Sequence, residues 1–210
     1  MDKTKLAVEV FNSCAKEYQD KFMYLDLYND TFDLFCDSIK KQNADLLEVA
    51  CGPGNITKYL LKSRADFKIL GIDLAPNMIT LAANNNPAAE FKIMDCRDVS
   101  RMDKKFDGIM CGFCLPYLSK EEAIQFIKDA STLLQEGGVV YISTMEGDYN
   151  TSGLKKSSSG KNECYIHYHQ ADYLIGCLKE NYFSILDLQR KNYPAQDGTT
   201  TVDLIIIARK

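Results

Sequence analysis

Glycine and proline are scarce in this sequence, and it contains neither an internal repeat nor a low-complexity tract. Its 210 residues include 12 glycines and 5 prolines, which excludes a collagen-like chain and a disordered chain rich in both residues. No domain linker is visible, so the length predicts a single domain over residues 1–210. A chain of this length can bury a core that needs no disulfide or metal to hold it.

A surplus of basic residues is also missing. The 25 lysines and arginines are outnumbered by 29 aspartates and glutamates, which gives a net charge of −4. Nucleic-acid-binding proteins usually carry a basic surplus or a basic stripe. The charge balance therefore argues against a nucleic-acid partner.

The eight cysteines are too sparse and too irregularly spaced for a disulfide framework. The N-terminal stretch is polar and lacks the apolar segment that secretory signals carry. The most apolar run, 204–208, is too short to span a bilayer and predicts a buried strand. We therefore expect a cytoplasmic protein with reduced thiols and no membrane partner.

Short apolar runs alternate with helical segments from about residue 44 onward. Nearly continuous apolar strands, each followed by a helix, are typical of a parallel sheet covered on both faces. Strands are predicted at 45–51, 68–73, 90–95, 106–113 and 137–144, and helices at 55–62, 76–83 and 119–134, the last opened by a capping box. This pattern predicts a doubly wound, Rossmann-like α/β core over residues 44–210.

The two ends of the chain are less regular. Apolar spacing between residues 6 and 40 predicts two short helices, so 1–43 is expected to form a helical lid. The stretch 146–161, rich in Ser, Gly and Lys, predicts a mobile surface loop. A helix at 169–180 should precede strands at 184–190 and 202–209, which the turn at 194–198 would pair antiparallel.

The most informative segment is a Gly-x-Gly turn between a predicted strand and a predicted helix. The strand ends at Cys51, Gly52 and Gly54 form the turn, and the helix begins near Asn55. Glycines let a ligand approach the backbone closely, and a helix N-terminus offers free N–H groups. Asp73 ends the next strand, where a carboxylate can accept hydrogen bonds from a ribose diol. Together these features predict a nucleotide-like ligand.

The charge of that ligand can be inferred from the residues around the turn. A pyrophosphate-binding turn needs a third glycine, but Thr57 stands at that position. Glu48, just before the turn, would repel phosphates and favour an ammonium or a sulfonium. S-adenosylmethionine carries both cations and no phosphate. The residues therefore favour it over a nicotinamide dinucleotide.

The stretch Glu48-Val-Ala-Cys-Gly-Pro-Gly54 resembles the first motif of the class I S-adenosylmethionine-dependent methyltransferases. The resemblance covers about residues 44–210 and implies a seven-stranded sheet of order 3-2-1-4-5-7-6 with an antiparallel last strand. It implies an enzyme that methylates an O, N, S or C atom of a small molecule. One departure is Ala50, which stands where the family usually has its first glycine. We expect it to alter the turn and not to abolish binding.

The resemblance also implies roles for individual residues. The two glycines of the turn would lie against the amino-acid end of the cofactor, Asp73 would bind its ribose, and residues of motif three would bind its adenine. There, Asp95 would accept from the adenine amino group and the backbone of Cys96 would donate to the ring. The implied cofactor-binding set is Glu48, Ala50, Gly52, Gly54, Asp73, Leu74, Met78, Asp95, Cys96, Cys111 and Gly112.

No catalytic triad accompanies this set, and the catalytic residues are left open. His169 is a weak candidate for a general base, and Tyr117 for a wall of the substrate pocket. Cys111 and Cys114 form a single C-x-x-C, for which buried reduced thiols are the preferred interpretation, so no metal is expected. Tyr18, Tyr28 and the 146–170 segment are candidates for a lid.

Two other functions remain open on the sequence alone. One is a non-catalytic protein that binds S-adenosylmethionine, because methyl transfer needs few signature residues. The other is a nicotinamide-dependent oxidoreductase, which the missing third glycine disfavours. The segment 113–117 departs from the Asn/Asp-Pro-Pro-Tyr of methyltransferases that act on nucleic acids, so a small-molecule substrate is favoured. The methyl acceptor and the oligomeric state carry no signature.

Overall fold

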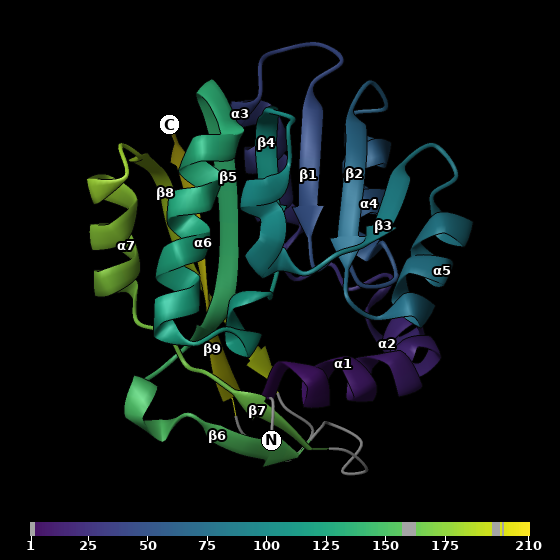
Figure 1. Ribbon diagram of the computed structural model, residues 1–210, viewed down its shortest axis with the longest axis vertical. Coiled ribbons are helices and arrows are strands. Elements are labelled where there is room, and N and C mark those ends of the chain that lie inside the picture. Colours follow the sequence, from purple (N-terminus) through teal and green to yellow (C-terminus); the bar gives the residue numbers. More distant parts are fainter. Residues whose placement is uncertain (1–2, 157–162, 195–197, 199) are drawn as a thin grey trace.

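A seven-stranded sheet forms the centre of the computed structural model, which describes residues 3–156, 163–194, 198 and 200–210 (Figure 1). The strands follow the order β3 (Glu90–Ile93), β2 (Lys68–Asp73), β1 (Asp45–Val49), β4 (Phe106–Cys111), β5 (Leu134–Glu146), β9 (Thr200–Arg209) and β8 (Ser184–Pro194). The first five are parallel, and β9 runs antiparallel to both β5 and β8. Counted within this sheet alone, the order is the predicted 3-2-1-4-5-7-6.

Helices cover both faces of the sheet. In Figure 1, α6 (Lys120–Leu133) and α7 (Ala171–Glu180) lie in front of it, and α3 (Asn29–Ser38) and α4 (Asn55–Ser63) lie behind it. Successive side chains of a strand point to opposite faces of the sheet, so each strand contributes residues to a core on either side. Along β5, Val140 and Ile142 join the cluster with α6, whereas Val139 and Tyr141 join the cluster with α3. The sandwich predicted from continuous apolar strands is confirmed.

The capping box predicted at Ser119 is present. The Ser119 hydroxyl accepts from the Glu122 backbone N–H at 3.2 Å, and the Glu122 carboxylate accepts from the Ser119 N–H at 2.7 Å. Two orphan donors of the first turn are thereby satisfied. The predicted helix 76–83 is α5 (Pro76–Asn85), with its proline in the first turn as expected.

The N-terminal segment differs from the prediction because it holds three helices instead of two. They are α1 (Lys3–Ser13), α2 (Ala15–Phe22) and α3. Cys14 separates α1 from α2, because its backbone leaves the helical conformation (φ −106°, ψ 18°) although the apolar spacing continues. Figure 1 shows α1 crossing below the carboxyl ends of β1, β2 and β4.

The loop predicted over 146–161 is not wholly irregular. A short helical turn η3 (Tyr149–Thr151) is followed by β6 (Gly153–Lys156), which pairs antiparallel with β7 (Glu163–Ile166). Residues 157–162 lie outside the described residues. Cys164 and Ile166 pack against Ala7 of α1, a contact distant in sequence that no local pattern could reveal. The small sheet and α1 thus meet beside the carboxyl edge.

The C-terminal strands are antiparallel, as predicted, and the turn between them lies mostly outside the described residues. Among the described residues, no helix combines the length and the apolar character that crossing a membrane requires. The division into a lid at 1–43 and a core at 44–210 stays a prediction.

Candidate functional site

The glycine turn links the end of β1 to the start of α4. Gly52 and Gly54 both have positive φ, 53° and 77°, which glycine adopts without a steric penalty. A Cβ on Gly54 would collide with the Asn86 amide, which donates to the Gly54 carbonyl at 2.9 Å. A Cβ on Gly52 would make only ordinary contacts, with the Tyr18 ring at 3.8 Å and the Asn55 side chain at 4.0 Å. Gly54 therefore fixes the turn against α5, and Gly52 faces the N-terminal helices.

Ala50, at the position where the sequence lacks a glycine, also has a positive φ, of 54°. A left-handed conformation brings the alanine Cβ close to the following carbonyl and costs about 1–2 kcal/mol. The backbone at Ala50 therefore has the left-handed conformation that a glycine would adopt, and the alanine side chain makes this conformation strained.

Glu48 is buried directly beneath the turn, with 1% of its surface exposed. The Thr57 hydroxyl donates to its Oε2, and Oε1 has no hydrogen-bond partner among the described residues. Burial raises the pKa of Glu48 to about 8, against the opposing effect of the Thr57 hydrogen bonds. A buried carboxyl with an unused oxygen is suited to receive a cationic group.

Asp73 ends β2 and binds the turn from the neighbouring strand. Its Oδ2 accepts from the Gly52 N–H at 2.9 Å, and its Oδ1 accepts from the Ala75 N–H at 2.8 Å. Burial raises the pKa of Asp73, and the backbone hydrogen bonds oppose that rise. Each carboxylate oxygen can accept a further hydrogen bond, so Asp73 can hold the turn and still accept from a diol.

Asp95 is already engaged by a side chain that sequence reasoning missed. Arg97 donates from its guanidinium to both carboxylate oxygens, at 2.6–3.0 Å, and from its backbone N–H to Oδ1. It also reaches Glu122 at 3.1 Å. Burial would raise the pKa of Asp95, but Arg97 holds that pKa below its usual value. Acceptance of an additional amino group by Asp95 would require Arg97 to shift.

The end of β4 lies next to the turn across the sheet, because Val49 of β1 is in register with Cys111. Gly112 leaves room for Ile56 of α4, with which a Cβ would collide, and the Phe113 N–H donates to the Ser143 hydroxyl at 3.0 Å. The Cys114 thiol lies 3.6 Å from the Cys96 thiol. Within the described ranges, no three His, Cys, Asp or Glu side chains gather in a way that could hold a metal ion.

The N-terminal helices contact this edge through specific hydrogen bonds. The Asn12 side chain accepts from the Asn77 N–H, and the Asn77 amide donates to the Asn12 carbonyl, both at 2.8 Å. Met78, a member of the expected cofactor-binding set, packs with Ala15 of α2, and Leu74, another member, is half-buried. The helices thus close over the start of α5 and over the glycine turn.

The two weak catalytic candidates have different surroundings. His169 is fully buried, and its Nε2 and Nδ1 contact the Leu115 carbonyl at 2.8 Å and the Tyr173 hydroxyl. Burial lowers its pKa to about 4, so the ring is neutral at pH 7 and both nitrogens have partners. The Tyr117 ring packs edge-on against the Phe11 ring of α1, with the ring centres 5.0 Å apart. Tyr117 lines the space under α1, whereas His169 ties η2 (Leu115–Tyr117) to α7.

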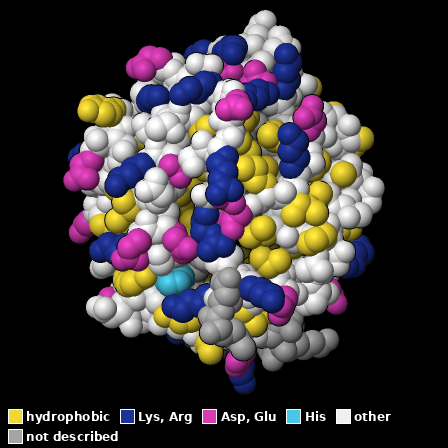
Figure 2. Space-filling model, in the orientation of Figure 1, with side chains coloured by type: hydrophobic (Ala, Val, Ile, Leu, Met, Phe, Trp, Pro, Cys, Tyr) yellow, Lys and Arg dark blue, Asp and Glu magenta, His cyan; other side chains and the backbone are white. Residues whose placement is uncertain are grey.

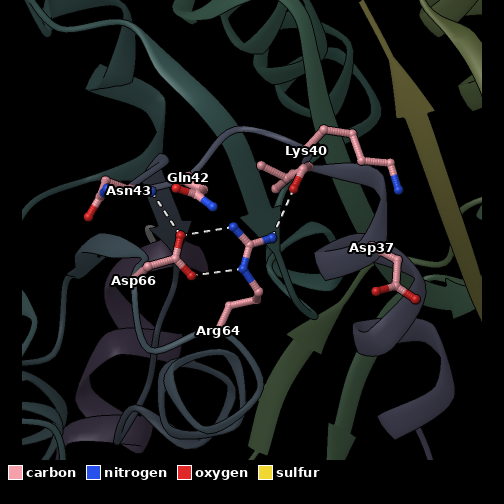
Figure 3. A pocket seen from close by; sticks show the side chains of 7 residues that line it. Asp37, Lys40, Gln42, Asn43, Arg64 and Asp66 are labelled. Carbon is pink, nitrogen blue, oxygen red and sulfur yellow. Dashed lines mark hydrogen bonds and ion pairs between the residues drawn. The ribbon is translucent and has the colours of Figure 1, made fainter.

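A hollow of about 460 Å³ lies elsewhere, where the chain enters β1 and β2 (Figure 3). Arg64 there binds Asp66 through two hydrogen bonds of 2.8 and 2.9 Å and also donates to the Ile39 and Lys41 carbonyls. These bonds fasten the loop before β1. The hollow sits at the amino edge, whereas open α/β sheets bind ligands at the carboxyl edge.

Charges on the face shown in Figure 2 are mixed, with Lys and Arg side chains interspersed among Asp and Glu. Ion pairs also occur on the surface of the described part of the chain, such as Lys104 with Asp45 at 2.7 Å. This mixture agrees with the near balance of charges in the sequence.

Residues 46–138 match a family model described as a methyltransferase domain. Protein 235L of Invertebrate iridescent virus 6, which carries a methyltransferase name, is 26% identical over 89% of this chain and 69% of its own length. A malonyl-[acyl-carrier protein] O-methyltransferase of Acetivibrio thermocellus is 37% identical over 48% of this chain, and this match spans 36% of that relative.

Solved structures share the fold along the whole chain. The N-methyltransferase NodS from Bradyrhizobium japonicum, in complex with S-adenosylhomocysteine, has a TM-score of 0.71 at 16% identity, covering 100% of this chain and 99% of its own. Magnesium protoporphyrin IX methyltransferase from Synechocystis, with bound S-adenosylmethionine, has a TM-score of 0.72 at 15% identity, covering 100% and 98%. The seven-stranded sheet and its order are therefore those of known methyltransferase structures.

Proposed function

We propose that this chain, whose residues 46–138 match a methyltransferase-domain model, is a class I S-adenosylmethionine-dependent methyltransferase that transfers the methyl group of its cofactor to an O, N, S or C atom of a small molecule. The observation that carries the proposal is the glycine turn held between two carboxyl groups. Glu48 lies beneath the turn with one unused oxygen, and Asp73 binds its backbone from the side. A ligand that carries both a cation, for Glu48, and a diol, for Asp73, matches this pair of carboxyl groups.

The remaining cofactor contacts follow from the same placement. Glu48 binds the ammonium of the amino-acid end, with Ala50, Gly52 and Gly54 forming the backbone beside it. Asp73 accepts from the ribose hydroxyls. The residues that follow on the same edge flank or contact the adenine and the methionine chain; these are Leu74, Met78, Asp95, Cys96, Cys111 and Gly112.

The bound cofactor supplies a methyl group that its sulfonium already activates, so alignment is the main task of the protein. The N-terminal helices close this edge through Asn12 and Tyr18, which would exclude water and hold the acceptor in line. His169 is not proposed as the base, because both of its ring nitrogens have partners. Tyr117 is proposed as a wall of the acceptor pocket.

A small-molecule acceptor fits the mixed charges of the surface and the absence of the nucleic-acid motif after β4. Relatives named for malonyl-[acyl-carrier protein] and for trans-aconitate suggest that acceptors vary widely among such domains. The cytoplasmic location predicted from the sequence is kept as part of this proposal.

Isothermal titration calorimetry on the reduced protein tests the cofactor. S-adenosylhomocysteine should bind with micromolar affinity and NADH should not bind. Asp73→Asn should weaken S-adenosylhomocysteine by roughly tenfold or more, the loss expected when a charged hydrogen-bond acceptor is removed. Asp103→Asn is the control, since Asp103 is an exposed carboxylate in the loop before β4.

Binding of NADH in place of S-adenosylhomocysteine would overturn the proposal. Tight binding of S-adenosylhomocysteine without turnover of any acceptor would leave the non-catalytic alternative. A radiolabelled-methyl assay over a panel of small acceptors separates these two outcomes.

A further inference from the structure

Asp203 lies where the sheet extends beyond the end of β4. The pairing of β4 with β5 stops at Cys111 and Ile142, but β5 continues to Glu146 beside β9. Asp203, near the start of β9, stands opposite Met145 in this extension. Its side chain is nevertheless buried, with only 2% of the residue exposed.

The carboxyl group of Asp203 is only half satisfied. The Tyr28 hydroxyl donates to Oδ2 at 2.6 Å, and Oδ1 has no hydrogen-bond partner among the described residues. Lys191, its neighbour across the β8–β9 pair, does not supply the missing charge, because its ammonium binds Asp30 at 2.5 Å. A buried carboxylate without a cation is costly, so the site favours a cation from outside the chain.

Aromatic rings connect Asp203 with the end of β4. The Tyr28 ring lies edge-on to Phe113 with ring centres 5.2 Å apart, and Phe113 directly follows Gly112. Tyr193, near the end of β8, pairs with Thr201, two residues before Asp203, and therefore lies on the same face of the sheet as Asp203. Aromatic faces attract ammonium groups, so these rings reinforce the preference of the carboxylate.

We propose that Asp203, walled by Tyr28, Phe113 and Tyr193, binds an ammonium group of the methyl acceptor, which is therefore a small organic amine. This inference rests on the proposed function and specifies its substrate class. Glu48, on the other side of the β4 end, is reserved for the cofactor, so the two buried carboxyl groups serve two different cations. Burial raises the pKa of Asp203 to about 6, which leaves the group ionised at pH 7.

The test uses matched pairs of amines and alcohols in the presence of S-adenosylmethionine. The probes are 2-phenylethylamine with 2-phenylethanol, tyramine with 4-(2-hydroxyethyl)phenol, and putrescine with 1,4-butanediol. Binding is measured by calorimetry with S-adenosylhomocysteine present, and methyl transfer by radiolabel. The wild-type chain should prefer at least one amine over its alcohol by tenfold or more in Kd or in kcat/KM.

Asp203→Asn keeps an oxygen to accept from Tyr28 and removes the charge. This variant should lose the amine preference by about tenfold while its Kd for S-adenosylhomocysteine changes less than twofold. Asp103→Asn removes an exposed carboxylate in the loop before β4 and should keep the preference.

Equal binding of amines and alcohols by the wild-type chain would overturn the inference, and so would an unchanged preference in Asp203→Asn. These wild-type measurements decide the matter even if Asp203→Asn does not fold. Failure of S-adenosylhomocysteine to bind would instead refute the proposed function, so the two failures are distinguishable.

Discussion

Ala50 carries backbone strain at the point where β1 enters the glycine turn. Its φ of 54° is matched by φ values of 53° and 77° at the two glycines that follow. Alanine pays for this conformation in the folded state, while glycine would lose more chain entropy on folding. The two effects oppose each other. The steric effect is the larger, so replacing Ala50 by glycine should stabilise the folded state.

Ala50→Gly should therefore raise the free energy of unfolding by about 0.5–1 kcal/mol. Urea unfolding followed by circular dichroism measures this change. Ala83→Gly is the matched control, because Ala83 is exposed in the last turn of α5 and glycine there should destabilise by up to about 1 kcal/mol. Destabilisation of both variants would show that the turn is unstrained.

At the residue scale, the sequence reveals groups whose partners are local and hides those whose partners are distant. Glu48 and Asp73 lie at the carboxyl ends of the neighbouring strands β1 and β2, and Gly52 follows β1, so spacing alone brings them together. Asp203 meets Tyr28 across 175 positions, and no local pattern indicates that contact. Arg97 lies two residues from Asp95, yet its bidentate contact depends on how the short η1 (Cys96–Arg101) turns.

At the element scale, α1 and α2 are held to the core by two small apolar clusters and by a few polar contacts. Asn12 exchanges two hydrogen bonds with Asn77 at the start of α5, and Gln19 accepts from the Asn85 amide at 2.8 Å. Few contacts and solvent-exposed hydrogen bonds characterise segments that open locally at low cost. Release of a ligand held beneath α1 should depend on these bonds.

Asn12→Ala should speed the dissociation of S-adenosylhomocysteine by about fivefold, the effect of losing roughly 1 kcal/mol of hydrogen bonding that closes the site. Stopped-flow displacement measures the rate. Ser13→Ala is the control on the same helix, since the Ser13 hydroxyl bonds within the helix to the Val10 carbonyl. Equal rates in Asn12→Ala and wild type would mean that α1 does not gate the site.

Strands and core helices were predictable because each carries its own apolar signal. Thus 204–208 is fully buried within β9, as its unbroken run of apolar residues indicates. The pair β6 and β7 escaped prediction because both strands are only four residues long and β6 is mostly exposed, with Lys or Glu at three of the eight positions. What orders it is packing of Cys164 and Ile166 on α1, a tertiary contact.

At the scale of the whole molecule, buried acids link folding stability to pH. Glu48 has a pKa raised to about 8, so the folded state holds a proton that the unfolded state releases at lower pH. Stability from such a group is complete below the unfolded pKa and is lost as the pH rises through about 8. The raised pKa of Asp203, about 6, likewise makes the folded state less stable as the pH rises toward 6. The lowered pKa of His169, about 4, has the opposite effect over the same range, because the folded state excludes a proton that the unfolded state binds.

Between pH 6.5 and 8, Glu48 should therefore dominate, and the wild-type free energy of unfolding should fall by about 1–2 kcal/mol. Glu48→Gln retains an acceptor for Thr57 and should flatten this slope. Urea unfolding at four pH values in that range is the measurement. A slope that persists in Glu48→Gln would assign the titration to another group.

The order of the sheet was predictable only through the resemblance of the glycine turn to a known motif. Alternation of strands and helices limits the topology to a doubly wound sheet, but it does not say on which side β4 is added. The antiparallel insertion of β9 between β5 and β8 likewise depends on pairing across distant segments.

The insertion of β9 also has a consequence for the order in which the protein matures during synthesis. Glu48, Gly52 and Asp73 leave the ribosome long before Asp203. Asp203 reaches its place only when β9 pairs with β5 and β8. The groups assigned to the cofactor are thus made first, and the group assigned to the acceptor is added by the last strand. A nascent chain halted before β9 would present half of a site and no complete sheet to support it.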